Sequence, residues 1–192
     1  MKVLGIVGSP RKGGNTEILV MEALQAAREA GAETEIFLAA GKDIALCNAC
    51  GACRVDENGV CVIQDDMQEL YRLMESSDGI IFGTPVYFYN VSSQAKVIMD
   101  RTYSLRRGGD GKLKGKVAAA LVVARRVGAG QVLSLIYAYF TLQGLIVAGG
   151  GIGYGRGKGE VRQGVGGSPS LSAMEEARSV GKSVVSLLKR LS

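Results

Sequence analysis

Apolar residues along the chain fall into short continuous runs that alternate with longer amphipathic stretches. The first run, residues 2–8, leads through a polar loop into apolar residues at helical spacing between positions 18 and 27, which predicts a strand followed by a helix. The same alternation continues along the chain. It predicts four more strands at residues 33–38, 79–83, 116–124 and 145–149, and four more helices at residues 67–77, 92–103, 132–142 and 171–191.

Several predicted strands lack the two-residue alternation of a half-exposed strand. The runs VAAALVV at 117–123 and GIIFG at 79–83 are apolar throughout, as expected when helices cover both faces of a sheet. Strands alternating with helices in this way predict an α/β fold with a doubly wound parallel sheet. Ligands of such sheets bind outside the carboxyl ends of the strands, so the loops after the strands are where function is expected.

Composition and charge narrow the classes of protein. The 192 residues are 47% hydrophobic, which suits one domain spanning 1–192, and no apolar run is long enough to cross a bilayer. The N-terminal run lacks the longer apolar region of a signal peptide, so we expect a soluble cytoplasmic protein. The net charge of +5 is spread along the chain, which fits an anionic cofactor or an acidic partner and disfavours nucleic acid. The chain has no histidine, so its chemistry must come from Cys, Tyr, carboxylates or a cofactor.

The loop after the first predicted strand concentrates hydrogen-bond donors. The sequence GSPRKGGNT at residues 8–16 places backbone amides, hydroxyls and an arginine at the start of a helix, which favours an anion site. It has neither the Gly-Lys-Ser/Thr ending of a Walker loop nor the spacing of a dinucleotide fingerprint, so the expected ligand is a monophosphate. The alternative is a glycine-rich turn in which Thr16 only caps the helix. The candidate phosphate ligands are Ser9, Arg11, Asn15 and Thr16.

Two segments, in this order, resemble the NADPH-dependent FMN reductase branch of the flavodoxin-like proteins. Residues 8–16 are similar to that family's FMN phosphate loop, and residues 77–89, SDGIIFGTPVYFY, resemble its third strand and the loop that cradles the flavin ring. Residues 96–101 resemble part of the helix that follows in the family. The resemblance implies bound FMN and a flavodoxin-like, doubly wound five-stranded parallel sheet of order 2-1-3-4-5 with helices on both faces.

Two loops would hold the flavin ring. The segment 84–90 can offer backbone amides to the polar edge of the ring while aromatic side chains cover its face. The loop after the fourth strand lies where the family makes its remaining flavin contact. Alternatively, the aromatic residues belong to the core or to an interface and the arginines face solvent. The candidate residues are Thr84, Pro85, Val86, Tyr87, Phe88 and Tyr89 in the first loop and Ala124, Arg125, Gly128 and Gly130 in the second.

All four cysteines lie in one insertion of about residues 45–64, after the second predicted strand. Cys47, Cys50 and Cys53 form a CxxCxxC run, and Cys61 follows after seven further residues. This spacing brings three thiolates onto a small loop within reach of a fourth, and four Cys ligands suit a single [4Fe–4S] cluster. The alternatives are a tetrahedral zinc site, a disulfide pair, and free or redox-active thiols.

The complete pattern resembles the iron–sulfur flavoproteins of archaea and anaerobic bacteria. It comprises the phosphate loop, the cysteine insertion, Asp65-Asp66-Met67 at the next helix start and TPVYFYN at 84–90. This resemblance implies an oxidoreductase that takes electrons from an acidic low-potential carrier such as ferredoxin through the cluster to FMN and an acceptor. It also implies a homodimer or a homotetramer.

Two other functions remain open from the sequence. One is an NAD(P)H-dependent FMN or quinone reductase in which no cluster forms and the cysteines are incidental. The other is a non-enzymatic module that uses redox-responsive thiols or a zinc-stabilised loop to engage a partner. A flavin electron carrier needs no side-chain acid or base, so no catalytic residue is assigned, and Asp78, Asp100 and Arg101 are interpreted as helix-end and packing charges.

The glycine-rich segment 149–155, GGGIGYG, follows a predicted strand. No helix opens after its third glycine and no acidic residue follows at the required distance, so the segment does not predict a nicotinamide site. We expect the stretch 149–167 to begin with a mobile loop near the flavin or an oligomer contact.

Overall fold

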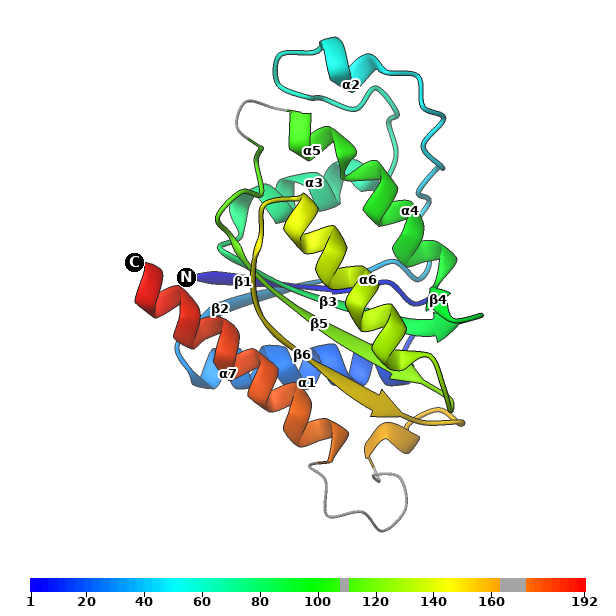
Figure 1. Ribbon diagram of the computed structural model, residues 1–192, viewed down its shortest axis with the longest axis vertical. Helices are drawn as coiled ribbons and strands as arrows, with labels where there is room; N and C mark the ends of the chain where they lie inside the picture. Colours follow the sequence, from blue (N-terminus) through cyan, green and yellow to red (C-terminus); the bar gives the residue numbers. More distant parts are fainter. Residues whose placement is uncertain (108–110, 163–171) are drawn as a thin grey trace.

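Five parallel strands form the centre of the molecule in the computed structural model (Figure 1). The structure describes residues 1–107, 111–162 and 172–192. In spatial order the strands are β2 (Glu33–Leu38), β1 (Lys2–Val7), β3 (Gly79–Tyr87), β5 (Val117–Ala124) and β6 (Ile146–Tyr154). A two-residue strand, β4 (Asn90–Val91), pairs antiparallel with the end of β3. When the five parallel strands are numbered in chain order without β4, β5 and β6 become the fourth and fifth, and the spatial order is 2-1-3-4-5. The predicted doubly wound topology is therefore confirmed.

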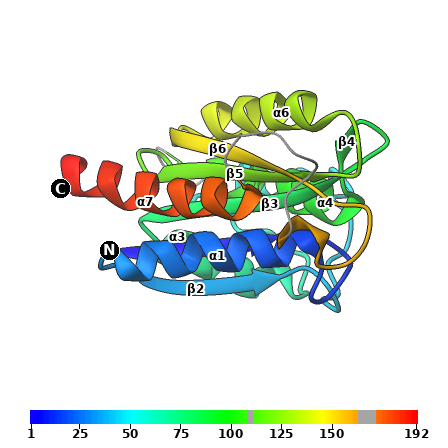
Figure 2. The same cartoon turned by 90° about the horizontal axis from the view of Figure 1, so that it is seen from below.

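Helices cover both faces of the sheet. Figure 1 shows helices on both sides of the sheet, and Figure 2 looks onto the side that carries α1 and α7. This layer consists of α1 (Asn15–Glu29) and α7 (Ala173–Leu191). The opposite layer consists of α3 (Met67–Ser76), α4 (Ser93–Arg101) and α6 (Ala129–Leu142), and the short elements are α2 (Ala52–Val55), α5 (Tyr103–Arg107) and the 3₁₀ turn η1 (Glu160–Arg162).

The buried hydrophobic side chains form two clusters, one on each face. One joins the sheet to Leu70 of α3, Ile98 of α4 and Ile136 of α6. The other joins it to Val20 of α1 and Val184 of α7. All eight residues of β5 are buried, as expected for a central strand covered on both faces, which explains why its sequence shows no alternation.

The last strand is longer than the sequence predicted, and the loop expected at 149–155 is wrong up to Tyr154, because β6 continues to that residue. Its glycines leave room for helices on both sides. A Cβ atom at Gly150 would lie 2.5 Å from Tyr137 Oη of α6, and one at Gly153 would lie 2.7 Å from Leu19 Cδ1 of α1. Glycine is unfavourable inside strands, and here close packing against helices explains its presence. The rest of the stretch, 163–167, lies outside the described residues, as does Leu171, the predicted start of the last helix.

Other boundaries also shift. The third strand extends through Thr84 to Tyr87, so four of the seven residues of the predicted loop 84–90 belong to β3, and Asn90 belongs to β4. The predicted helix 92–103 is divided into α4 and α5, and α6 begins three residues earlier than expected, at Ala129. None of the described helices has the length and apolarity needed to cross a membrane.

Candidate functional site

A cavity of about 260 Å³ lies at the carboxyl ends of β1, β3 and β5, the edge where ligands of doubly wound sheets bind. The phosphate loop, the end of β3 and the end of β5 all contribute to its walls. The predicted ligand residues that line it are Ser9, Arg11, Asn15, Thr16, Pro85, Val86, Tyr87, Ala124 and Arg125. Segments far apart in sequence are therefore brought together here by the parallel strands.

The phosphate loop is fixed where it leaves β1. The amide of Gly8 donates to the carbonyl of Gly83 at 2.8 Å, and the Ser92 hydroxyl, which also caps α4, donates to the carbonyl of Gly8. Helix α1 begins at Asn15 with Gly14 as its N-cap, and glycine has no side chain to satisfy the first amides of the helix. These amides, with the buried hydroxyls of the loop, can receive an anion.

Asn15 lines the cavity, as predicted, and also contacts the backbone of a distant segment. Its Nδ2 donates to the carbonyl of Gly157 at 2.8 Å, and its Oδ1 accepts from the amide of Gly159 at 2.7 Å. It thereby holds the segment after β6 against the phosphate loop. Arg156 and Lys158 of this segment line the cavity, and sequence reasoning missed both. Their position directly after the last parallel strand was the signal, because that strand ends at the same edge of the sheet.

A second cavity, of about 770 Å³, adjoins the first and shares Val86, Arg125 and Arg156 with it. Phe88, Tyr89, Arg126 and Val127 complete its lining. Apolar and aromatic walls with arginines at the rim suit a flat anionic ligand that continues out of the smaller cavity.

The aromatic side chains of this cavity come from a tight hairpin between β3 and β4. Its two central residues, Phe88 and Tyr89, have φ of 46° and 59°, in the left-handed region typical of a type I′ turn. Side chains other than Asn, Asp or Gly are strained there, and such strain often accompanies a ligand site. Phe88 is fully exposed, so the hairpin presents its ring to whatever occupies the cavity or lies beyond it.

Three remaining candidates surround this hairpin. Gly128, the N-cap of α6, has a φ of 88°, and a Cβ atom there would approach Tyr89 Cδ1 to 3.1 Å. Thr84 is buried, where its hydroxyl accepts from the amide of Ser92 at 3.2 Å and donates to the carbonyl of Pro85 at 3.0 Å. Gly130 lies in the first turn of α6. None of these three residues lines either cavity.

The four cysteines line one cavity of about 530 Å³ in the insertion between β2 and α3. Cys47 and Cys50 are exposed, whereas Cys53 and Cys61 are partly buried, and none forms a disulfide. Two residues in the left-handed region, Ala49 at a φ of 55° and Gly51 at 77°, turn the chain within the CxxCxxC run. The structure thus gathers the predicted ligand set around one space.

The donor set fits an iron–sulfur cluster in its chemistry, because four cysteine thiols line the cavity, and its one carboxylate, Asp100, is paired with Lys96. Within the described residues, no three Cys, Asp or Glu side chains are close enough to hold a metal ion together. Partial burial and the neighbouring Cys61 thiol raise the pKa of Cys53, so a metal would have to offset the charge of the ionised thiols. The loop must close further to coordinate one.

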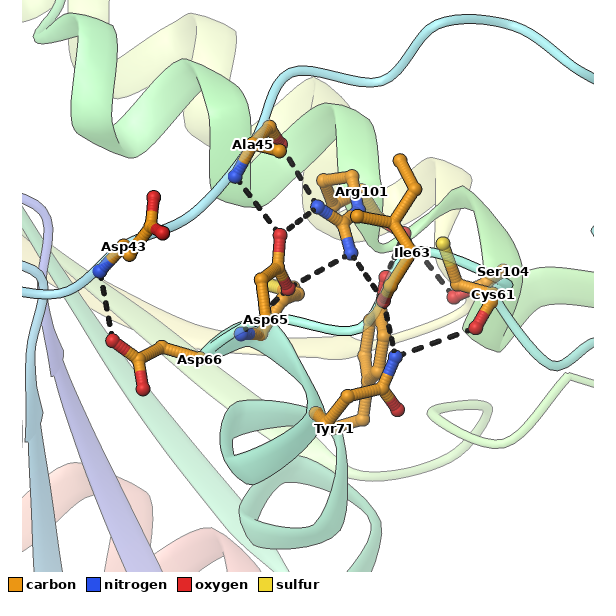
Figure 3. A network of polar contacts seen from close by, with 11 residues as sticks. Asp43, Ala45, Cys61, Ile63, Asp65, Asp66, Tyr71, Arg101 and Ser104 are labelled. Atoms are coloured by element: carbon orange, nitrogen blue, oxygen red, sulfur yellow. Dashed lines mark hydrogen bonds and ion pairs between the residues drawn. The ribbon is translucent and has the colours of Figure 1, made fainter.

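Beneath the cysteine cavity lies a buried ion pair between Asp65, just before α3, and Arg101, the last residue of α4 (Figure 3). The guanidinium Nη1 lies 2.6 Å from Asp65 Oδ2, and Nη2 lies 3.1 Å from Oδ1. The side chains of Arg101 and Asp65 are 0% and 6% exposed. Arg101 was interpreted from the sequence as a packing charge, but its partner and its place in the wall of the cysteine cavity were not foreseen.

Burial and hydrogen bonding shift the pKa of Asp65 and of the neighbouring Tyr71 in opposite directions. Burial raises the pKa of Asp65, but hydrogen bonds from Arg101 and from the amides of Ala45 and Met67 outweigh burial, so that pKa lies below its ordinary value. Burial also raises the pKa of Tyr71 to about 12, and the Tyr71 hydroxyl donates to the carbonyl of Arg101 at 2.9 Å. Asp65 and Arg101 are therefore both charged at neutral pH.

A parallel sheet of this order, with a cavity beside the loop that follows its first strand, is typical of a flavodoxin-like α/β protein. The model of the NADPH-dependent FMN reductase family matches residues 1–157. An iron–sulfur flavoprotein of Methanocaldococcus jannaschii is 40% identical over 98% of this chain and 98% of its own. The chain belongs to the NADPH-dependent FMN reductase family, has iron–sulfur flavoproteins among its relatives, and is a flavin-dependent oxidoreductase.

Solved structures agree on the fold. The structure of RosB with a bound riboflavin 5′-phosphate derivative has a TM-score of 0.81 at 20% identity, with 100% of this chain and 80% of RosB covered. A flavodoxin from the domain Archaea has a TM-score of 0.61 at 12% identity, with 98% of this chain and 99% of the flavodoxin covered. The flavodoxin-like fold predicted from the sequence is confirmed.

Proposed function

We propose that the chain binds FMN across the two adjoining cavities and a [4Fe–4S] cluster at Cys47, Cys50, Cys53 and Cys61, and that it passes electrons from an acidic low-potential carrier such as ferredoxin through the cluster to FMN and an acceptor. The observation that carries this proposal is that all four cysteines line one cavity in a loop inserted into a flavin-binding fold. Bound FMN exchanges electrons singly or in pairs, which links one-electron carriers to two-electron acceptors.

The chain's own groups have separate tasks toward FMN. The hydroxyls of Ser9 and Thr16, the first amides of α1 and the Arg11 guanidinium would bind the phosphate, with Lys158 adding positive charge. The end of β3 and the hairpin would hold one side of the ring and keep water from it. Arg125 lies in both cavities and is placed to counter negative charge on the ring.

Positive charge beside the cysteine cavity supports an acidic carrier. Arg54 and Arg107 both donate to the hydroxyl of Tyr103, at 3.3 Å and 2.7 Å, and Tyr103 lines the cavity. Complementary charge speeds the encounter of redox partners. A cytoplasmic location is part of this proposal, since free thiols persist in a reducing compartment. A homodimer or homotetramer is the oligomeric state that we propose with it.

The direct test is to purify the protein without oxygen and measure iron, acid-labile sulfide, zinc and FMN per chain. Four iron and one FMN are expected. Cys50→Ser should lose iron and keep FMN, whereas the control Val55→Ser, on an exposed side chain of the same loop, should keep both. FMN without iron in the wild-type protein would remove the cluster from the proposal, and zinc would make the loop a structural or partner-binding element.

A cluster-free NAD(P)H-dependent FMN or quinone reductase is the second candidate, favoured by the three arginines around the larger cavity, Arg125, Arg126 and Arg156. They could bind the phosphates of a nicotinamide nucleotide beside an open flavin face. Steady oxidation of NADPH by a quinone, with the same rate in wild type and Cys50→Ser, would support this function. Reduction by ferredoxin that is lost in Cys50→Ser would support the first proposal.

A further inference from the structure

The two ends of the cysteine insertion meet at a neck. On the outer side, the Asp43 amide donates to Asp66 Oδ2 at 2.7 Å, and the Asp66 amide donates back to the carbonyl of Asp43 at 3.0 Å. These reciprocal bonds bring the chain leaving β2 alongside the chain entering α3 (Figure 3). The neck is thus closed by hydrogen bonds although the loop beyond it has little regular structure.

The Asp65–Arg101 pair binds both sides of this neck one step further into the loop. On the first side, the Ala45 amide donates to Asp65 Oδ2 at 2.9 Å and the Ala45 carbonyl accepts from Arg101 Nη1 at 2.8 Å. On the second side, the Ile63 carbonyl accepts from Arg101 Nη2 at 3.4 Å. One guanidinium therefore contacts the residues two positions before Cys47 and two positions after Cys61.

Arg101 is held independently of the loop. Its backbone carbonyl accepts from the hydroxyls of Tyr71 at 2.9 Å and Ser104 at 3.1 Å, so α3, α4 and α5 fix its position. Its side chain lines the cysteine cavity, and its buried Nε–H has no acceptor among the described residues. A fixed cation with an unused donor at this wall is suited to anionic contents.

Stability alone does not account for the pair. Buried ion pairs are often no more stabilising than apolar side chains of the same size, and their best-attested use is to specify one arrangement. Here the pair fixes the distance between the two ends of the cysteine loop. Three of the four cysteines follow the first end, at Ala45, and the fourth precedes the second end, at Ile63.

We propose that Arg101 and Asp65 are positioning residues for the cysteine ligand set, fixing the neck of the loop so that Cys61 closes onto Cys47, Cys50 and Cys53. This inference rests on the proposed function, because it presupposes that these thiols bind a metal centre together. Neither residue is a ligand, and their loss should weaken metal binding without affecting FMN, because the two proposed FMN cavities share no lining residue with the cysteine cavity.

The test uses the double variant Asp65→Asn, Arg101→Met, which removes both charges together and leaves neither unpaired. Its control is Glu22→Gln, Glu29→Gln, Arg178→Met, which removes together the ion pairs that Arg178 of α7 forms with two glutamates of α1 on the other face of the sheet. Both are prepared as reduced, metal-free protein loaded with FMN. Cobalt(II) is titrated without oxygen and followed by its thiolate charge-transfer absorption, and hydrogen exchange of residues 46–62 is measured alongside.

The double variant should bind cobalt(II) about tenfold or more weakly, as is usual when groups that orient ligands are lost, and its loop amides should exchange faster. Arg101→Lys, which keeps the charge but not the two-pronged geometry, should fall between it and wild type. FMN affinity and the control variant should be unchanged. Equal cobalt affinity or equal exchange in the double variant overturns this inference alone, whereas a wild-type protein that binds no metal through its cysteines overturns the proposed function with it.

Discussion

FMN is proposed to bind at the carboxyl ends of β1, β3 and β5, which we call the flavin edge. The flavin edge and the cysteine insertion are held in place by different kinds of contact. At the flavin edge, each contributing segment lies at the carboxyl end of a parallel strand or directly after it, so the order of the strands also brings the candidate ligand groups together. In the insertion, a single turn of helix is the only regular element among the described residues, and the cysteines depend on the neck beneath them. One site is determined by the topology of the fold and the other by a few buried polar contacts.

The largest effect is expected from breaking only one half of the buried pair. Asp65→Asn leaves the Arg101 charge buried without a counter-ion, which should destabilise the protein by about 3–5 kcal/mol in chemical denaturation. The double variant Asp65→Asn, Arg101→Met should recover most of this loss. Equal destabilisation in the two variants would mean that the hydrogen bonds to Ala45 and Ile63, and not the unpaired charge, dominate the free energy of unfolding.

A smaller effect, confined to ligand affinity, is expected at the flavin edge. Arg11→Met removes a charged donor from the smaller cavity, where the FMN phosphate is proposed to bind. Because a hydrogen bond to a charged group is worth about 1.5–3 kcal/mol, FMN should bind roughly tenfold or more weakly. Quenching of FMN fluorescence during titration measures this. The unfolding free energy of the apoprotein should be unchanged, and Lys2→Met, far from both cavities, serves as the charge-matched control.

Acid should weaken the neck of the cysteine insertion. The folded-state pKa of Asp65 lies below its unfolded value of about 3.9, so the pair contributes stability above about pH 4 and loses it as pH falls toward the folded pKa. The loss of unfolding free energy between about pH 7 and about pH 3 should therefore be larger in wild type than in the double variant. Parallel curves for the two proteins would contradict this assignment.

The smallest effect concerns the strained hairpin, and its sign is opposite. Phe88→Asn, Tyr89→Gly places residues that tolerate left-handed backbone at both central positions, which should stabilise the protein by about 1 kcal/mol. FMN binding should weaken at the same time because the aromatic cover is lost. Phe88→Ala, which removes a ring but keeps the strained backbone, should weaken FMN binding without stabilising the fold.

The sequence was sufficient for features that repeat or lie close together. Apolar runs gave the sheet, and the cysteine spacing gave a ligand set that the fold gathers around one cavity. It failed where tertiary packing decides. The glycines of β6 indicated a loop because nothing local shows that Tyr137 and Leu19 lie against them. Asp65 and Arg101 are 36 residues apart, and no pattern shows that they meet.

The assignment of roles to single residues was limited in the same way. Asn15 has a polar side chain that suits an anion ligand. Its amide group is also hydrogen-bonded at both ends to the backbone of Gly157 and Gly159, which follow β6. That contact spans 142 residues and brings in two basic side chains, Arg156 and Lys158. Which polar group faces a ligand depends on partners that only the folded chain supplies.

The hydrogen bonds that close the neck make the cysteine insertion structurally independent of the sheet. Because Asp43 and Ala45 are bound to Asp65 and Asp66 beneath it, the residues between can change in length or disappear without disturbing the register of any sheet strand. A short turn in place of residues 46–62 would leave the flavin edge intact, since loop length has little effect on closure entropy. A chain shortened in this way would lose all four cysteines together and keep every residue that lines the two cavities at the carboxyl ends of the strands.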